Sequence, residues 1–196
     1  AFAEAGFGSY DSFNSFSQAS NITANGSTRY YGAGMLGHQE FANGMYIDGS
    51  LRAGRVESSY RSTDLENALG HSTSFDSNRT YYSAHMGLGK TLKVSQQGSL
   101  DMYTKLFYTR QNADNITIFG DPFTFDAITS RRARLGLRYS HKTSDTMQIY
   151  AGLAFEREFN GKAKGSVHGL QMDAPSLKGN TGILDVGVRL KPLPTR

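Results

Sequence analysis

The sequence predicts an all-β protein, an up-and-down antiparallel β-barrel that crosses a membrane with about eight strands. Apolar and polar residues alternate along eight segments, and the connections between those segments alternate between long and short. The composition agrees, because Gly (22), Tyr (11) and Phe (12) are abundant while Cys and Trp are absent. The mean hydropathy of −0.47 is that of a water-soluble chain. A membrane barrel averages to the same value, because its apolar outer residues alternate with polar inner ones.

The alternation has the period of two that is typical of β-strands. Residues 183–190, for example, place Val186 and Val188 on one face and Asp185 and Arg189 on the other. No segment shows the apolar stripe of a helix at a period of 3.6 residues, apart from a possible short turn around 64–69. The eight predicted strands are residues 2–10, 29–37, 45–54, 81–89, 99–110, 133–140, 147–156 and 183–190.

The connections separate a membrane barrel from a soluble β-sandwich, which would show the same alternation. Barrels that span a membrane turn tightly on one side and carry longer loops on the other, whereas a Greek-key sandwich has no reason to do so. Both chain ends then fall on the short-turn side, which is the periplasmic side in outer-membrane barrels. The predicted long loops are 11–28, 57–79, 111–130 and 160–181, and the predicted short turns are 38–44, 93–98 and 141–146.

The polar face of the predicted strands carries both signs of charge. A barrel of more than eight strands needs such an interior, because its lumen holds water. We therefore predict a wet lumen that is wide enough for a helix or an extended chain. The predicted lumen-lining residues are Glu4, Asp48, Arg52, Asp101, Lys105, Arg134, Arg138, Glu156, Asp185 and Arg189. Aromatic residues near strand ends predict girdles at the membrane surfaces, namely Tyr31, Tyr46, Tyr81, Tyr82, Tyr108, Tyr139 and Phe155.

Several other functions are disfavoured by the sequence. The absence of Cys excludes a disulfide framework, a thiolate metal site and a Cys nucleophile. Residues 84–91 nearly spell a phosphate-binding loop, but Ala84 replaces its first Gly and no helix follows. The five histidines form no metal-binding pair, and no catalytic Ser, His and Asp set emerges from spacing. A net charge of +4 is weak evidence for nucleic acid. We therefore expect no enzyme activity, no cofactor, no metal and no nucleic-acid partner.

Several segments match, in order, the sequence motifs of one known family. The run 30–56 has a Gly-rich strand, a short turn and an S-x-R-x-G-R strand. Residues 99–140 contain the next strand pair around a G-D-P-x-x-F-D-A loop, and residues 154–163 and 173–192 contain late E-x-E-F-x-G-K-A and D-A-P-S-L-K-G segments. Together these segments resemble the C-terminal translocator barrel of type V autotransporters. The resemblance covers about 2–192, and we expect residues 1–196 to form a single domain.

The resemblance implies a barrel in the bacterial outer membrane that supports secretion and surface display of its own N-terminal passenger domain. It implies outer-membrane lipid and the barrel-assembly machinery as partners. Family barrels have twelve strands, a helix in the pore and a terminal aromatic residue, whereas this sequence shows about eight strands and ends at Arg196. We therefore expect a barrel that is incomplete at both ends, with about two strands missing from each.

Two alternatives remain open. The chain could be a complete eight-stranded outer-membrane barrel with a structural or adhesive role through its long loops. It could also be a barrel enzyme or a soluble ligand-binding barrel, since a fold alone does not fix a function.

Overall fold

The computed structural model describes residues 1–191 except 16, 18–19, 68 and 173–175. Asp173, Ala174 and Pro175 of the D-A-P-S-L-K-G segment, and residues 192–196, lie outside the described residues. None of the described residues belongs to a helix long and apolar enough to span a membrane.

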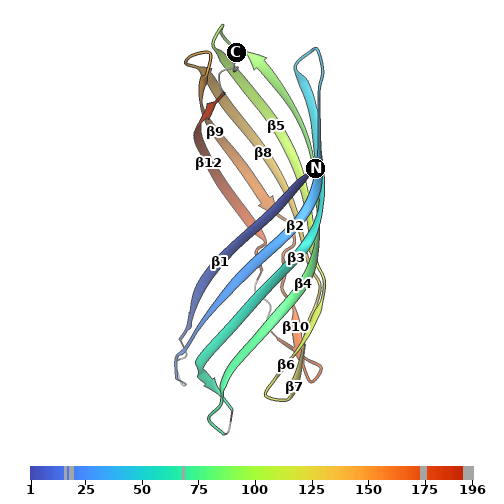
Figure 1. Ribbon diagram of the computed structural model, residues 1–196, viewed down its shortest axis with the longest axis vertical. Coiled ribbons are helices and arrows are strands. Elements are labelled where there is room, and N and C mark those ends of the chain that lie inside the picture. The colour runs from blue at the N-terminus through green and yellow to red at the C-terminus, as the bar shows by residue number, and fades with distance from the viewer. Residues whose placement is uncertain (16, 18–19, 68, 173–175, 192–196) are drawn as a thin grey trace, which may run out of the picture.

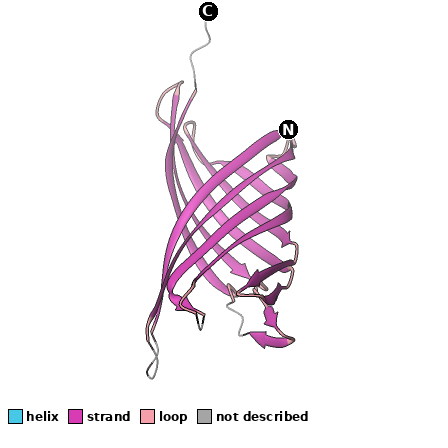
Figure 2. Ribbon diagram, turned by 60° about the horizontal axis from the view of Figure 1, so that its bottom comes forward, coloured by secondary structure: helices cyan, strands magenta, loops and turns pink. Residues whose placement is uncertain are grey.

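Eight long strands form one antiparallel sheet in the order β1-β2-β3-β4-β5-β8-β9-β12. The sheet is strongly curled, and its strands run obliquely to the long axis of the molecule (Figures 1 and 2). Among the described residues β1 and β12 are its two edges and do not pair with each other. The strands are β1 (Phe2–Asn14), β2 (Ile22–Glu40), β3 (Met45–Glu66), β4 (Ser72–Lys93), β5 (Gly98–Gln111), β8 (Ile128–Lys142), β9 (Met147–Glu158) and β12 (Gly179–Leu190).

The prediction of eight antiparallel strands is confirmed, because each predicted segment lies inside one of these strands. Three connections of the sheet are tight turns, at residues 41–44, 94–97 and 143–146. The first of them needs Gly44, whose φ of 78° lies in the left-handed region that glycine adopts without steric cost. Because these connections are so short, the two strands that each of them joins must be neighbours in the sheet.

The prediction of long loops at 11–28 and 57–79 is wrong, because most of these residues extend the strands. β3 continues to Glu66 and β4 begins at Ser72, so that only a short turn joins them. These extensions are polar on both faces and therefore show no alternation of hydropathy. Cross-strand contacts hold them instead: the Tyr60 and Phe75 rings stack with centroids 5.0 Å apart. The Thr23 N–H and hydroxyl both donate to Asp64, which lowers the pKa of that carboxyl.

The prediction of loops at 111–130 and 160–181 is also wrong in part, because two hairpins form there. They build a small second sheet in the order β11-β10-β7-β6. Each hairpin turns on a pair with positive φ, Phe119–Gly120 and His168–Gly169. Such pairs suit the two-residue turns whose twist matches that of hairpin strands. The strands are β6 (Asp114–Ile118), β7 (Asp121–Phe125), β10 (Gly165–Val167) and β11 (Leu170–Met172).

This small sheet leans against the far end of β4, opposite the tight turns (Figure 1). The Ser77 hydroxyl donates to Asp114 at 2.5 Å, and the Arg79 guanidinium lies 3.7 Å from the same carboxylate. The Arg79 guanidinium also covers the Phe125 ring at 5.1 Å. The hairpins are therefore fixed to the main sheet by an ion pair and an aromatic contact.

The two faces of the main sheet differ sharply. Large apolar side chains of one face remain exposed, among them Phe7, Leu51, Leu153, Leu184 and Val186. The opposite face is more buried, and tyrosine rings lie there over glycines of neighbouring strands. A Cβ at Gly6, Gly89, Gly136 or Gly187 would overlap the ring of Tyr30, Tyr46, Tyr103 or Tyr150 respectively. Glycine is therefore required at these positions so that the rings can lie flat on the backbone.

The expectation of aromatic girdles is wrong for two of its residues. Tyr46 and Tyr81 lie on the more buried face, where their hydroxyls donate to Asp101 and Glu4. Both belong to the polar parity of their strands, as the register with neighbouring glycines shows. The other five aromatic residues are half-exposed on the apolar face, namely Tyr31, Tyr82, Tyr108, Tyr139 and Phe155.

Replacing Gly136 by Val should destabilise the sheet, because the new side chain would occupy the place of the Tyr103 ring. Overpacking of this kind costs about 1–3 kcal/mol. We expect a lower urea midpoint for the refolded full-length protein, measured by the heat-dependent shift of its band on a gel. Adding Tyr103→Ser should restore much of the loss. Gly182→Val is the matched control, since nothing lies within 4 Å of a Cβ there. Equal loss in both single variants would contradict the role of the tyrosine ring.

Candidate functional site

The polar face of the curled sheet is its concave face. Side chains on this face contact each other across an intervening strand. Such contacts form on the concave side of a curled sheet, because side chains there point toward one another. Arg52 of β3 reaches Glu4 of β1 across β2, with 2.9 Å between guanidinium and carboxylate. The Tyr81 hydroxyl of β4 donates to the same carboxylate. Glu4 therefore connects β1 to β3 and β4, although β2 lies between β1 and these two strands.

A second cluster joins β3, β4 and β5. The Asp48 carboxylate lies 2.7 Å from the His85 Nε2 and 3.1 Å from the Lys105 ammonium. The Ser50 hydroxyl lies 2.5 Å from the other ring nitrogen of His85. Closer to the tight turns, the Tyr46 hydroxyl donates to Asp101 at 2.9 Å. Each acidic group here thus faces a cation or a hydroxyl donor.

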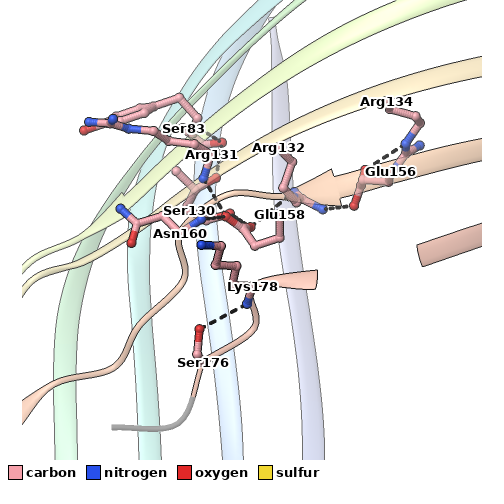
Figure 3. A network of polar contacts seen from close by, with 12 residues as sticks. Ser83, Ser130, Arg131, Arg132, Arg134, Glu156, Glu158, Asn160, Ser176 and Lys178 are labelled. Atoms are coloured by element: carbon pink, nitrogen blue, oxygen red, sulfur yellow. Dashed lines mark hydrogen bonds and ion pairs between the residues drawn. The ribbon is translucent and has the colours of Figure 1, made fainter. Parts of the chain in front are cut away.

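The third cluster occupies β8 and β9 (Figure 3). Glu156 binds both neighbouring arginines: Arg132 at 3.0 Å and Arg134 at 2.7 Å. Both guanidiniums also lie over the Phe107 ring, 5.2 and 5.1 Å from its centroid. Glu158 accepts hydrogen bonds from the Ser130 hydroxyl and from two backbone N–H groups. This cluster is the most densely charged part of the face.

The remaining predicted residues are Arg138 on β8 and Asp185 and Arg189 on β12. The Arg138 guanidinium pairs with Asp185 across β9 and covers the Tyr150 ring at 4.9 Å. Arg189 is exposed near the tight-turn end of β12, and no carboxylate of a described residue pairs with it. Nine of the ten predicted lumen-lining residues therefore make polar contacts on this face, and Arg189 stands apart.

Sequence reasoning missed several members of these clusters. Tyr46, His85, Arg132 and Glu158 share the polar parity of predicted residues on their own strands. That parity was a usable signal for all of them. Tyr81 also has this parity; it and Tyr46 were missed because aromatic residues near strand ends suit the outer face as well.

Ser50, His85 and Asp48 have the composition of a hydrolytic triad. Their geometry supports a structural role, because Lys105 holds the same Asp48 oxygen that His85 contacts. The backbone amides around Ser50 also belong to the ladders with β2 and β4, whereas a hydrolase needs free N–H groups for an oxyanion. The described residues contain no group of three His, Asp or Glu side chains that could hold a metal ion. The cluster therefore ties β3 to β4 and β5.

The concave face as a whole is polar and carries balanced charge. Most of its cations are paired with carboxylates at hydrogen-bond distance, so little net field of either sign remains. Where tyrosine rings cover glycines, the rings lie flat on the backbone of this face.

Comparison with known proteins agrees with this geometry. The crystal structure of the beta domain of the Bordetella autotransporter BrkA has a similar fold, with a TM-score of 0.55 and 18% sequence identity. The similarity covers 96% of this chain and 86% of that chain. No curated protein matches the chain. The family model of the autotransporter beta-domain matches residues 4–194. The chain therefore belongs to the autotransporter beta-domain family and is an outer-membrane translocator domain.

Proposed function

We propose that the concave face lines the route by which an N-terminal passenger of the same protein crosses the outer membrane. The observation that carries this proposal is the contrast between the two faces of one sheet. The convex face exposes large apolar side chains such as Leu51 and Leu153, which suits contact with lipid. The concave face holds paired ionic groups, which suits contact with water and a passing chain.

The proposed lining consists of the ten residues predicted from the sequence together with Tyr46, Tyr81, His85 and Arg132. Their charges balance within short distances, so a passenger of either net charge meets no strong barrier. No nucleotide-binding motif accompanies this lining in the sequence. The driving force in this proposal comes from folding of the passenger outside the cell.

The proposal includes two partners and one domain. Outer-membrane lipid contacts the convex face, and the barrel-assembly machinery inserts the strands. Residues 1–196 act as one structural domain, which is supported by the small sheet being fixed to β4 through Asp114. The family is one of secretion barrels rather than of catalysts. The absence of enzyme activity, of a cofactor and of a nucleic-acid partner stays a prediction.

The orientation can be tested with epitope tags in the full-length protein. A tag after Asn67, in the short connection of the β3 and β4 extensions, should be labelled on intact cells. Insertions in exposed connections add only a slowly growing entropy of loop closure, so assembly should proceed. A tag after Gln97, in the tight turn between β4 and β5, should be labelled only after the outer membrane is opened.

Passenger display on the same cells distinguishes the function from the orientation. We expect display to persist with the Asn67 tag. If only the Gln97 tag were labelled on intact cells, the proposed orientation of the barrel would be wrong. An inserted barrel of correct topology that never displays a passenger would contradict the translocation proposal.

A further inference from the structure

An apolar groove crosses the convex face over β2, β3, β4 and β5. It has a volume of 990 Å³. Its walls on the convex side are formed by long aliphatic side chains that are largely exposed, with Met35, Leu51 and Met86 at 72%, 68% and 67%. The convex face thus carries an apolar groove between exposed aliphatic side chains.

Two glycines create the floor of this groove. Gly37 and Gly49 face each other in the register of β2 and β3, and Gly49 also faces Met86 of β4. The adjacent rows are filled by Met35 with Leu51 and by Gln39 with Ile47. The groove is therefore one side chain deep, and a flexible hydrocarbon chain can lie in it. A Cβ at Gly37 would meet nothing within 4 Å, so the empty space lies directly above this residue.

A cation, Lys90, lies beyond the groove toward the tight turns. Lys90 follows Leu88 by two residues on the same face of β4 and faces Met45 of β3 and Met102 of β5. Its side chain is exposed. No carboxylate of a described residue pairs with it. The ammonium group is therefore available to an anion that approaches along the membrane surface.

We infer that the groove and Lys90 together bind one phospholipid with an anionic headgroup, taken from the periplasmic leaflet. An acyl chain lies over Gly37 and Gly49, and the phosphate meets the Lys90 ammonium. The distribution of groups selects this ligand, because the apolar part lies toward the middle of the strands and the cation toward the turns. The inference rests on the proposed function, which puts the convex face in lipid and the tight turns in the periplasm.

Native mass spectrometry of the full-length protein in a mild detergent tests this site. The probe is dioleoyl phosphatidylglycerol, with dioleoyl phosphatidylethanolamine as the net-neutral comparison. The wild type should retain one phosphatidylglycerol. Lys90→Gln should weaken its retention about fivefold, because one basic residue near an anionic lipid is worth about that factor. Gly37→Leu should abolish retention by filling the groove.

Gly182→Leu is the matched control, since this glycine of β12 is also open and lies outside the groove. It should retain phosphatidylglycerol like the wild type. Equal retention by all four proteins would overturn the site, and so would equal retention of both lipids by the wild type. Surface display of the passenger is measured in parallel for each variant. Loss of lipid with intact display refutes only the lipid site, whereas failed display by the wild type refutes the translocator proposal.

Discussion

Val186→Arg should lower the free energy of unfolding in lipid vesicles by about 2–4 kcal/mol, the cost of Arg on the lipid face near the bilayer midplane. Val186 lies in the middle of β12 on the convex face, where 69% of the residue is exposed. In lipid, that exposure places the guanidinium among acyl chains. Urea titration of the full-length protein, followed by its heat-modifiable gel band, measures the loss.

Ile183→Arg on the same strand is the matched control. Ile183 belongs to the concave parity of β12 and faces the small Ala154 of β9, so a guanidinium there can reach water. We expect a loss well below that of Val186→Arg. Gly136 and Gly187 share this parity but are unsuitable controls, because tyrosine rings cover both of them. Equal losses at Val186 and Ile183 would contradict the assignment of the two faces.

Glu156→Ala should cost about 2–4 kcal/mol, because it leaves two arginines facing each other without their shared partner. The Glu156 side chain is only 10% exposed and binds both Arg132 and Arg134. Removing one partner of a mostly buried ionic group leaves the other charges uncompensated, and this costs 3–5 kcal/mol when burial is complete. The expected cost is lower here because both arginine side chains are about 30% exposed and Arg132 keeps a 3.9 Å contact with Glu158.

Further variants isolate the origin of that cost. Glu156→Gln keeps the shape and one acceptor oxygen, so its loss should be smaller. Arg134→Ala with Glu156→Ala removes part of the repulsion and should be less destabilising than the sum of the single changes. Additive losses in the cycle of Arg134→Ala and Glu156→Ala would contradict the coupling of these two groups.

The sequence predicted the membrane-crossing strands well because lipid imposes a strict rule on them. Residues such as Leu137, Leu153 and Val186 must be apolar, and their neighbours must not be, so a period of two is visible without any homologue. Beyond the membrane this rule no longer applies. The β3 extension around Tyr60 is polar on both faces, and its pairing is fixed by contacts to Phe75 that lie outside any local pattern.

The candidate site was partly accessible from the sequence for the same reason. Parity alone places Asp48, Lys105 and Glu156 on one face, because side chains alternate along a strand. The partners of each charge depend on register and curvature, which no single strand encodes. Arg138 meets Asp185 only because β8 and β12 curl toward each other over β9. Tyr46 was missed for another reason: its parity is polar, but an aromatic ring near a strand end also suits the outer face.

The hydrogen bond from the Tyr81 hydroxyl to Glu4 joins residues that are 77 apart in the sequence, and this separation affects the folding kinetics. Hairpins closed by tight turns bring close neighbours together and can form early, whereas a contact between β1 and β4 must wait until the intervening strands have curled. Interactions that are absent from the transition state act on the unfolding rate rather than on the folding rate. Contacts between strands that are not neighbours therefore form late in folding. Weakening such a contact should shorten the lifetime of the folded sheet, whereas the rate of folding should hardly change.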